Sequence, residues 1–138
     1  MKILLLSHGF LANEMKQTAS MILGDFAHVT TLSLEEGADI VAYEEKIKSQ
    51  LDECDEMLVL VDLLGGTPFM TCAKIYRSLD DCDKSKFRVV TGMNLAMVLE
   101  VINNIDGSNL QELTNIATSI GQKGVVNVFE QLEEGDKS

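Results

Sequence analysis

The chain has 138 residues, 46% of them hydrophobic and 24% charged, which is the composition of one ordinary globular domain rather than of a disordered or membrane-spanning protein. Its 22 acidic and 11 basic residues give a formal net charge of −11, which argues against nucleic-acid binding because a phosphate backbone is repelled. A protein partner would instead be expected to present a basic patch. The three cysteines show no CxxC spacing and are typical of reduced thiols in a cytoplasmic protein, so no chemistry is assigned to them.

Short apolar runs alternate with segments whose apolar residues recur at helical spacing, which predicts repeated strand–helix units around a parallel sheet. The expected strands cover 2–7, 27–32, 57–61 and 87–91. The expected helices cover about 11–22, 38–53, 67–79, 94–105 and 109–121, with residues 80–85 forming a loop. Thr67 is expected to cap the third helix, with Pro68 in its first position, and Asn94 to cap the fourth.

A final β-like run at 125–129 predicts one more short strand. We expect a single domain at 1–130 and an acidic, frayed tail at 131–138. The four aliphatic residues that follow Lys2 are too few for a secretory signal, and no apolar stretch is long enough to cross a bilayer. The protein is therefore expected to be cytoplasmic, reaching the inner face of the membrane only through partner subunits.

The fold expected is α/β, a doubly wound and mostly parallel sheet in the order 2-1-3-4 with helices on both faces. In such sheets ligands bind beyond the carboxyl ends of the strands, where successive connections leave in opposite directions. The first strand ends in His8-Gly9 and the third in Asp62, which is followed by a glycine-rich turn. The order 2-1-3-4 makes these strands neighbours, so His8 and Asp62 are expected to line one crevice.

An imidazole oriented by a carboxylate suits reversible phosphorylation of a histidine. A neighbour that binds one ring N–H fixes the tautomer and leaves the other nitrogen's lone pair free to attack. Asp62 would be that neighbour of His8, while the N–H groups around Gly65, Gly66 and Thr67, with the Thr67 hydroxyl, could hold phosphate oxygens at a helix N-terminus. This chemistry needs no metal or cofactor. The other histidine, His28, starts the second strand and is interpreted as structural.

Three motifs together resemble the enzyme IIA component of mannose-family sugar phosphotransferase systems. They are Leu-Leu-Ser-His-Gly at 5–9, Val-Asp-Leu-Leu-Gly-Gly-Thr-Pro-Phe at 61–69 and Thr-Gly-Met-Asn-Leu at 91–95. The resemblance implies that His8 is the phosphorylated residue, that Asp62 orients it, and that Gly9 and Thr67 lie against the phosphoryl group. The chain departs from many relatives at Ala96, where they have proline.

The resemblance also implies the partners. Members of the family take a phosphoryl group from the phosphocarrier HPr and pass it to an enzyme IIB component, which phosphorylates sugar entering through a IIC/IID membrane permease. They are homodimers that exchange a C-terminal strand, which would give the run at 125–129 an antiparallel partner. Because the sequence has no fused IIB domain, the next acceptor is expected to be a separate polypeptide. The sugar itself cannot be read from the chain.

Four other functions fit parts of the sequence. A IIA-like subunit that phosphorylates dihydroxyacetone kinase would keep the histidine, although Gly-Gly-Thr-Pro-Phe favours the sugar system. Histidine phosphatases need an arginine before the histidine, where this chain has Ser7, and a second catalytic histidine. A receiver domain phosphorylated on Asp62 would need an acidic pair after the first strand to hold Mg²⁺, and this chain has Ser7-His8-Gly9 there. A small-molecule binding domain without catalytic activity also remains open.

Overall fold

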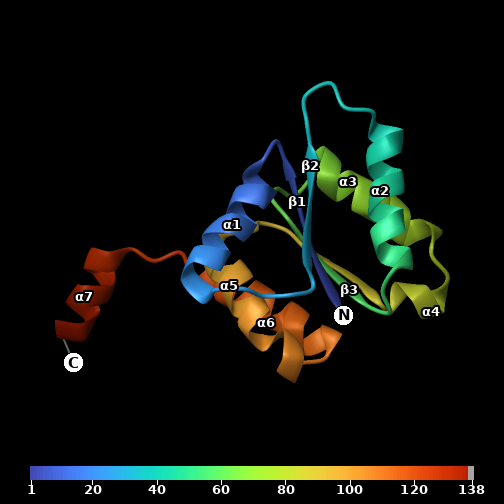
Figure 1. The fold of residues 1–138 in the computed structure, drawn as a ribbon. Coiled ribbons are helices and arrows are strands. Elements are labelled where there is room, and N and C mark those ends of the chain that lie inside the picture. Colours follow the sequence, from blue (N-terminus) through green and yellow to red (C-terminus); the bar gives the residue numbers. More distant parts are fainter. Residues whose placement is uncertain (137–138) are drawn as a thin grey trace.

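The computed structural model describes residues 1–136, which form a four-stranded parallel sheet with helices on both faces (Figure 1). The strands are β1 (Lys2–His8), β2 (Val29–Leu34), β3 (Met57–Val61) and β4 (Phe87–Val90). Their order is β2-β1-β3-β4 and every pair is parallel, which confirms the predicted topology. The second strand begins two residues later than the sequence indicated.

Within residues 1–136 the chain forms seven α-helices. They are α1 (Leu11–Leu23), α2 (Ile40–Asp52), α3 (Thr67–Ser78), α4 (Asp81–Lys84), α5 (Leu95–Asn104), α6 (Leu110–Lys123) and α7 (Val128–Asp136), with a 3₁₀ turn, η1, at Ile105–Gly107. One core cluster joins the sheet to α1, α5 and α6, and a second joins it to α2 and α3. Helices therefore cover both faces, as the alternation of apolar runs predicted.

The central strands are buried on both faces, which explains why they read as unbroken apolar runs. Along β1, Ile3 and Leu5 point into the first cluster while Leu4 and Leu6 point into the second, and all four are fully buried. The same alternation along β3 leaves its five residues without exposed surface. Both strands are thereby fixed in register, so their carboxyl ends reach the same edge of the sheet.

The start of α3 differs from the prediction by one residue. Gly66, not Thr67, is the N-cap, with extended backbone (φ −76°, ψ 169°) and a carbonyl that accepts from Met70 N at 2.9 Å. Thr67 is the first helical residue and Pro68 the second. The cap is a glycine because the chain passes close to another side chain at this point, as described below. The predicted cap at Asn94 is confirmed, since its side chain accepts from Met97 N.

Two segments have a structure that the sequence did not predict. The expected loop at 80–85 contains α4, because the Asp80 side chain accepts from Asp83 N and caps a single helical turn. The expected strand at 125–129 is wrong: α7 begins at Val128, with the Asn127 side chain accepting from Glu130 N at 3.3 Å. The glutamates that follow favour a helix over a strand.

Helix α7 extends away from the rest of the molecule (Figure 1). It includes residues 131–136 of the predicted tail, while 137–138 lie outside the described residues. Within residues 1–136, none of the helices has the length and apolar character that crossing a membrane requires.

Candidate functional site

His8 and Asp62 meet at the carboxyl edge of the sheet. His8 is the last residue of β1, and Asp62 directly follows the last residue of β3, the neighbouring strand. The Asp62 N–H donates to Leu6 O at 3.1 Å, so the ladder between the strands extends to the site itself. The predicted contact between the two side chains is confirmed.

One carboxylate oxygen fixes the imidazole at two points. Asp62 Oδ2 accepts from the backbone N–H of His8 at 3.0 Å and lies 2.9 Å from His8 Nδ1. An ionised carboxylate only accepts hydrogen bonds, so Nδ1 carries a proton and, in the neutral ring, Nε2 carries the lone pair. The Asp62 side chain is 11% exposed and the His8 side chain 48% exposed, so the orienting group is shielded while the ring stays accessible.

Gly66 lies directly against the free edge of the ring. A Cβ at this position would be 2.7 Å from His8 Cε1 and 3.4 Å from Nε2, closer than ordinary side-chain contacts allow. Gly65, next to it, has φ +85°, a left-handed conformation that glycine adopts without strain. The Gly65 and Thr67 N–H groups donate no hydrogen bond to any residue within 1–136. The site thus places a ring nitrogen of His8 beside backbone donors at the N-terminus of a helix.

The turn after β1 is held by Ser7, which is fully buried. Its hydroxyl oxygen accepts from Ala12 N at 2.8 Å, which secures the start of α1. Gly9, which was predicted to contact the phosphoryl group, has φ +55° and donates its N–H to Leu34 O at 2.8 Å. That amide is already used within the fold, as is the Gly66 N–H, which donates to Leu63 O at 3.4 Å, whereas the N–H groups of Gly65 and Thr67 donate to no residue within 1–136.

Large exposed apolar side chains follow both site residues in the chain, and the sequence did not reveal them. Phe10 and Leu11 after His8, and Leu63 and Leu64 after Asp62, are 49–67% exposed; we call these four residues the apolar collar. Two leucines in a glycine-rich turn, where no helix or strand buries them, are the signal that could have revealed it. The acidic pair at 35–36 lines a hollow together with His8, so the rim carries negative charge as well.

Comparisons with known proteins identify the family. The chain matches the family described as "PTS system fructose IIA component" over residues 2–118. It belongs to the mannose-type enzyme IIA components of the sugar phosphotransferase system. Enzyme IIA components of this family are phosphotransferases that serve as phosphocarriers in sugar uptake.

Individual relatives agree with this assignment. The chain is 31% identical over 123 residues to the "PTS system mannose-specific EIIAB component" of Escherichia coli K12; the match covers 86% of this chain and only 36% of that relative. Among solved structures, it is 35% identical (TM-score 0.79) to a PTS IIA protein associated with the fucose utilization operon of Streptococcus pneumoniae, covering 95% of each chain. A mannose/sorbose-specific IIA subunit from Enterococcus faecalis is 32% identical, with TM-score 0.79, covering 91% of this chain and 92% of that one.

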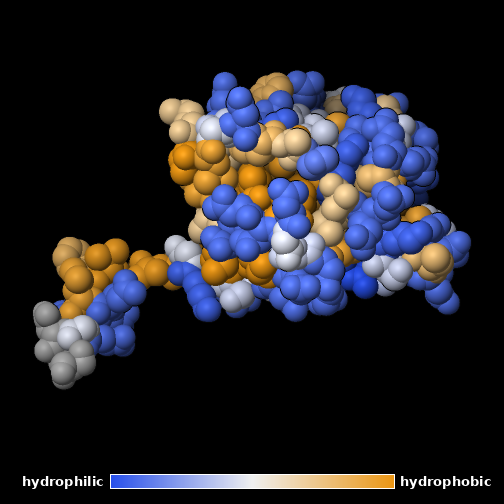
Figure 2. Space-filling view, turned by 60° about the horizontal axis from the view of Figure 1, so that its bottom comes forward, coloured by the Kyte–Doolittle hydropathy of each residue, from blue (hydrophilic) through white to orange (hydrophobic). Residues whose placement is uncertain are grey.

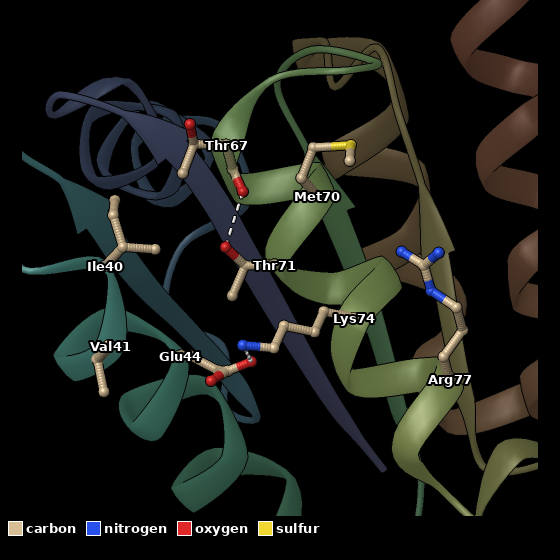
Figure 3. Close-up of a pocket in the computed structure, with 8 residues that line it drawn as sticks. All are labelled: Ile40, Val41, Glu44, Thr67, Met70, Thr71, Lys74 and Arg77. Atoms are coloured by element: carbon tan, nitrogen blue, oxygen red, sulfur yellow. Dashed lines mark hydrogen bonds and ion pairs between the residues drawn. The ribbon is translucent and has the colours of Figure 1, made fainter.

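In this enzyme IIA chain, Thr67 also lies at one end of a groove between α2 and α3, with a volume of about 340 Å³ (Figure 3). Its carbonyl accepts from the Thr71 hydroxyl at 2.8 Å, which secures the first turn of α3, while its own hydroxyl points away from Thr71 (Figure 3). Thr67 thus has a hydroxyl directed away from the helix body, at the turn that borders His8.

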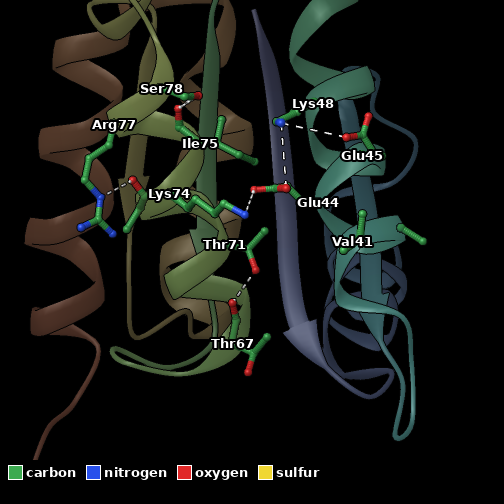
Figure 4. Close-up of polar contacts among 12 residues, drawn as sticks. Val41, Glu44, Glu45, Lys48, Thr67, Thr71, Lys74, Ile75, Arg77 and Ser78 are labelled. Atoms are coloured by element: carbon green, nitrogen blue, oxygen red, sulfur yellow. Dashed lines mark hydrogen bonds and ion pairs between the residues drawn. The ribbon is translucent and has the colours of Figure 1, made fainter.

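An ion-pair cluster holds α2 against α3 (Figure 4). Glu44 is buried, and its Oε1 lies 3.4 Å from Lys74 Nζ while its Oε2 lies 3.9 Å from Lys48 Nζ. Oε1 accepts no hydrogen bond within residues 1–136, so the contact with Lys74 is electrostatic rather than a well-aligned bond. Because Lys74 is exposed and Lys48 half-exposed, this cluster contributes modestly to stability and mainly fixes how the two helices lie.

His28 lies at the amino ends of the strands, and His8 at their carboxyl ends. Its carbonyl accepts from Ile3 N at the amino end of β1, so the length of that strand, about 20 Å, separates the two histidines. It adopts φ 69° in the turn before β2. The structure thus leaves His28 outside the site, consistent with the structural role interpreted from the sequence.

Proposed function

We propose that this enzyme IIA accepts a phosphoryl group from phospho-HPr on His8 Nε2 and passes it to an enzyme IIB component during sugar uptake. The observation that carries the proposal is the hydrogen bond between His8 Nδ1 and Asp62 Oδ2, which leaves the lone pair on the nitrogen that faces Gly66. A half-exposed ring is accessible to the phosphohistidine of a partner protein. The membrane permease would be reached only through IIB.

The transfer is a displacement at phosphorus. The Nε2 lone pair of His8 forms a new N–P bond as the N–P bond of the donor's phosphohistidine breaks, and the donor ring keeps the electron pair. Nδ1 retains its proton, so the imidazole of His8 becomes positively charged. The Asp62 carboxylate, 2.9 Å from Nδ1, stabilises that charge without moving. Reversal of the same steps, with IIB as acceptor, returns the ring to its neutral form.

The turn at Gly65–Thr67 is proposed to hold the phosphoryl oxygens. Its free N–H groups lie at the N-terminus of α3, where the helix dipole favours an anion. Gly66 lets the ring lie against this turn, and the Thr67 hydroxyl adds a donor. Such preorganised donors stabilise charge that spreads over the equatorial oxygens during transfer.

The partners are proposed to dock on the apolar collar. Exposed apolar side chains around a reactive group are typical of a protein–protein contact site. The net charge of −11 and the glutamates at 35–36 beside His8 would favour a partner with a basic surface and would speed its encounter. HPr and IIB would then use the same surface in turn, because each must reach the same nitrogen.

Labelling with radioactive phosphate tests the proposal. The chain is incubated with phosphoenolpyruvate, enzyme I and HPr, and the label is expected on one histidine and to be labile in acid. His8→Asn should abolish labelling. His28→Asn is the matched control, because asparagine tolerates the positive φ of that position, and it should label like the original protein. Label retained in His8→Asn, or stable in acid, would contradict the proposal.

We also propose that the chain forms a homodimer through its C-terminal segment. Val125, Val128, Phe129 and Leu132 are 58–80% exposed, and Figure 2 shows apolar side chains on the segment that extends from the body. Strand β4 is an edge of the sheet, and a hollow of about 620 Å³ lies beside it. A second copy's segment placed there would cover both apolar surfaces.

Analytical ultracentrifugation tests this assembly. The original protein is expected to sediment as a dimer, and Phe129→Glu to sediment as a monomer because a charge would enter the contact. Met21→Glu, a change of another strongly exposed apolar residue on α1, is the control and should leave the dimer intact. A monomeric original protein, or an unchanged dimer in Phe129→Glu, would refute the proposed contact.

A further inference from the structure

Two buried polar atoms near the site have no hydrogen-bond partner among residues 1–136. They are the hydroxyl oxygen of Tyr43 and Oδ1 of Asp62, the oxygen that does not contact His8. Buried polar groups are nearly always paired, because leaving one unpaired forfeits its hydrogen bonds to water. A donor and an acceptor that are both unpaired at the same end of the sheet therefore call for an explanation.

Tyr43 reaches toward the site from α2. Its side chain is 4% exposed and packs in the same core cluster as Val61, the residue immediately before Asp62, and as Cys72 of α3. Burial, and to a smaller extent the neighbouring Cys72 and Asp62, raise the pKa of Tyr43 well above its ordinary value of 10.0. The phenol thus keeps its proton at neutral pH and is a hydrogen-bond donor.

We infer that Tyr43 is a positioning residue: its hydroxyl donates to Asp62 Oδ1, after a small side-chain rotation or through one bridging water. The bond would pair both atoms at once, and a bond to a charged acceptor is stronger than one between neutral groups. Asp62 would then be held at both oxygens, Oδ2 by His8 and Oδ1 by Tyr43. The kinetic consequence of this inference rests on the proposed function of His8, but the hydrogen bond itself does not.

The role of Tyr43 would be to keep the carboxylate in the plane of the ring. With Oδ1 released, Asp62 could rotate about its side-chain bonds and hold Nδ1 less well as the ring becomes charged. Removing the hydroxyl alone, in Tyr43→Phe, is expected to lower the rate of phosphoryl transfer about tenfold. KM for phospho-HPr should stay unchanged, because Tyr43 is buried and does not reach the docking surface. The ring of phenylalanine fills the same space, so the fold is retained.

The experiment measures transfer kinetics and the ¹³C resonance of the Asp62 carboxyl group in the unphosphorylated protein. Tyr43→Phe should shift that resonance and slow transfer, while Tyr76→Phe, which removes the hydroxyl of the exposed tyrosine on α3, should do neither. In an Asp62→Asn background, Tyr43→Phe should slow transfer by less than about twofold, since the group that it positions has gone.

Two results would overturn the inference: an unmoved Asp62 resonance in Tyr43→Phe, or an equal loss of transfer rate in both backgrounds, which would indicate a purely structural role. The outcomes remain distinguishable from failure of the proposed function. If the original protein accepts no phosphoryl group at all, the proposed function falls, and the carboxyl resonance alone decides whether Tyr43 bonds to Asp62.

Discussion

Gly66→Ala is the substitution that tests the geometry of the site most closely. The added methyl group would lie 2.7 Å from His8 Cε1, and reaching an ordinary contact of 3.4 Å requires the ring to retreat by about 0.7 Å. A shift of that size would disturb the hydrogen bond between Nδ1 and Asp62, which is 2.9 Å long. Misplacement of a reacting group by about 1 Å can cost on the order of 100-fold in rate, so we expect a loss of roughly 10- to 100-fold in phosphoryl transfer.

Rapid-quench measurement of transfer from phospho-HPr would check this expectation, together with urea unfolding of the same variant. Stability should change little, because the contacted atom belongs to a half-exposed side chain that can move. Gly107→Ala is the matched control: Gly107 lies in η1, its added methyl group would meet nothing within 4 Å, and transfer should be unchanged. A Gly66→Ala protein that transfers at the original rate would refute the claim that His8 reacts while packed against this turn.

Three further predictions follow from single contacts. Asp62→Asn should slow transfer about 100-fold, because it removes the charge opposite Nδ1. Asp106→Asn, a change of an exposed residue, is the control and should transfer normally; equal rates in the two variants would remove Asp62 from the mechanism. Ser7→Ala should lower the free energy of unfolding by about 1–2 kcal/mol in urea, because the buried Ala12 N–H loses its acceptor, and an unchanged midpoint would contradict this. Burial raises the pKa of Cys72 from 9.0 to about 12, so above pH 9 the unfolded chain loses a proton that the folded chain keeps. The free energy of unfolding should therefore fall as the pH rises above 9. The fall should be less steep in Cys72→Ala, and equal slopes in the two proteins would contradict this contribution of Cys72.

The fold could be predicted from the sequence because its central strands are buried on both faces. Unbroken apolar runs such as 3–6 and 57–61 favour a parallel sheet that is buried on both faces, and the order 2-1-3-4 then brings His8 next to Asp62. That contact depends on topology alone, which the alternation of strands and helices determines.

The errors concern features that depend on distant contacts or on weak local preferences. Thr67 looked like the cap of α3, but the cap is Gly66, where the His8 ring, 58 residues earlier in the chain, leaves no room for a side chain. The run at 125–129 has strand-like residues, yet it pairs with no strand of this chain's sheet, and the glutamates that follow allow a helix. Tyr43 could not be associated with the site from the sequence, because only the packing of α2 on the sheet brings it near Asp62.

The nitrogen that carries the phosphoryl group is the most direct test of the account. Two-dimensional ¹H–¹⁵N NMR of the phosphorylated protein, labelled with ¹⁵N in its histidines, identifies both the residue and the ring position. The hydrogen bond from Nδ1 to Asp62 predicts phosphorylation of His8 at Nε2, with the Nδ1 proton retained. A phosphoryl group on Nδ1 of His8, or on either nitrogen of His28, would contradict it.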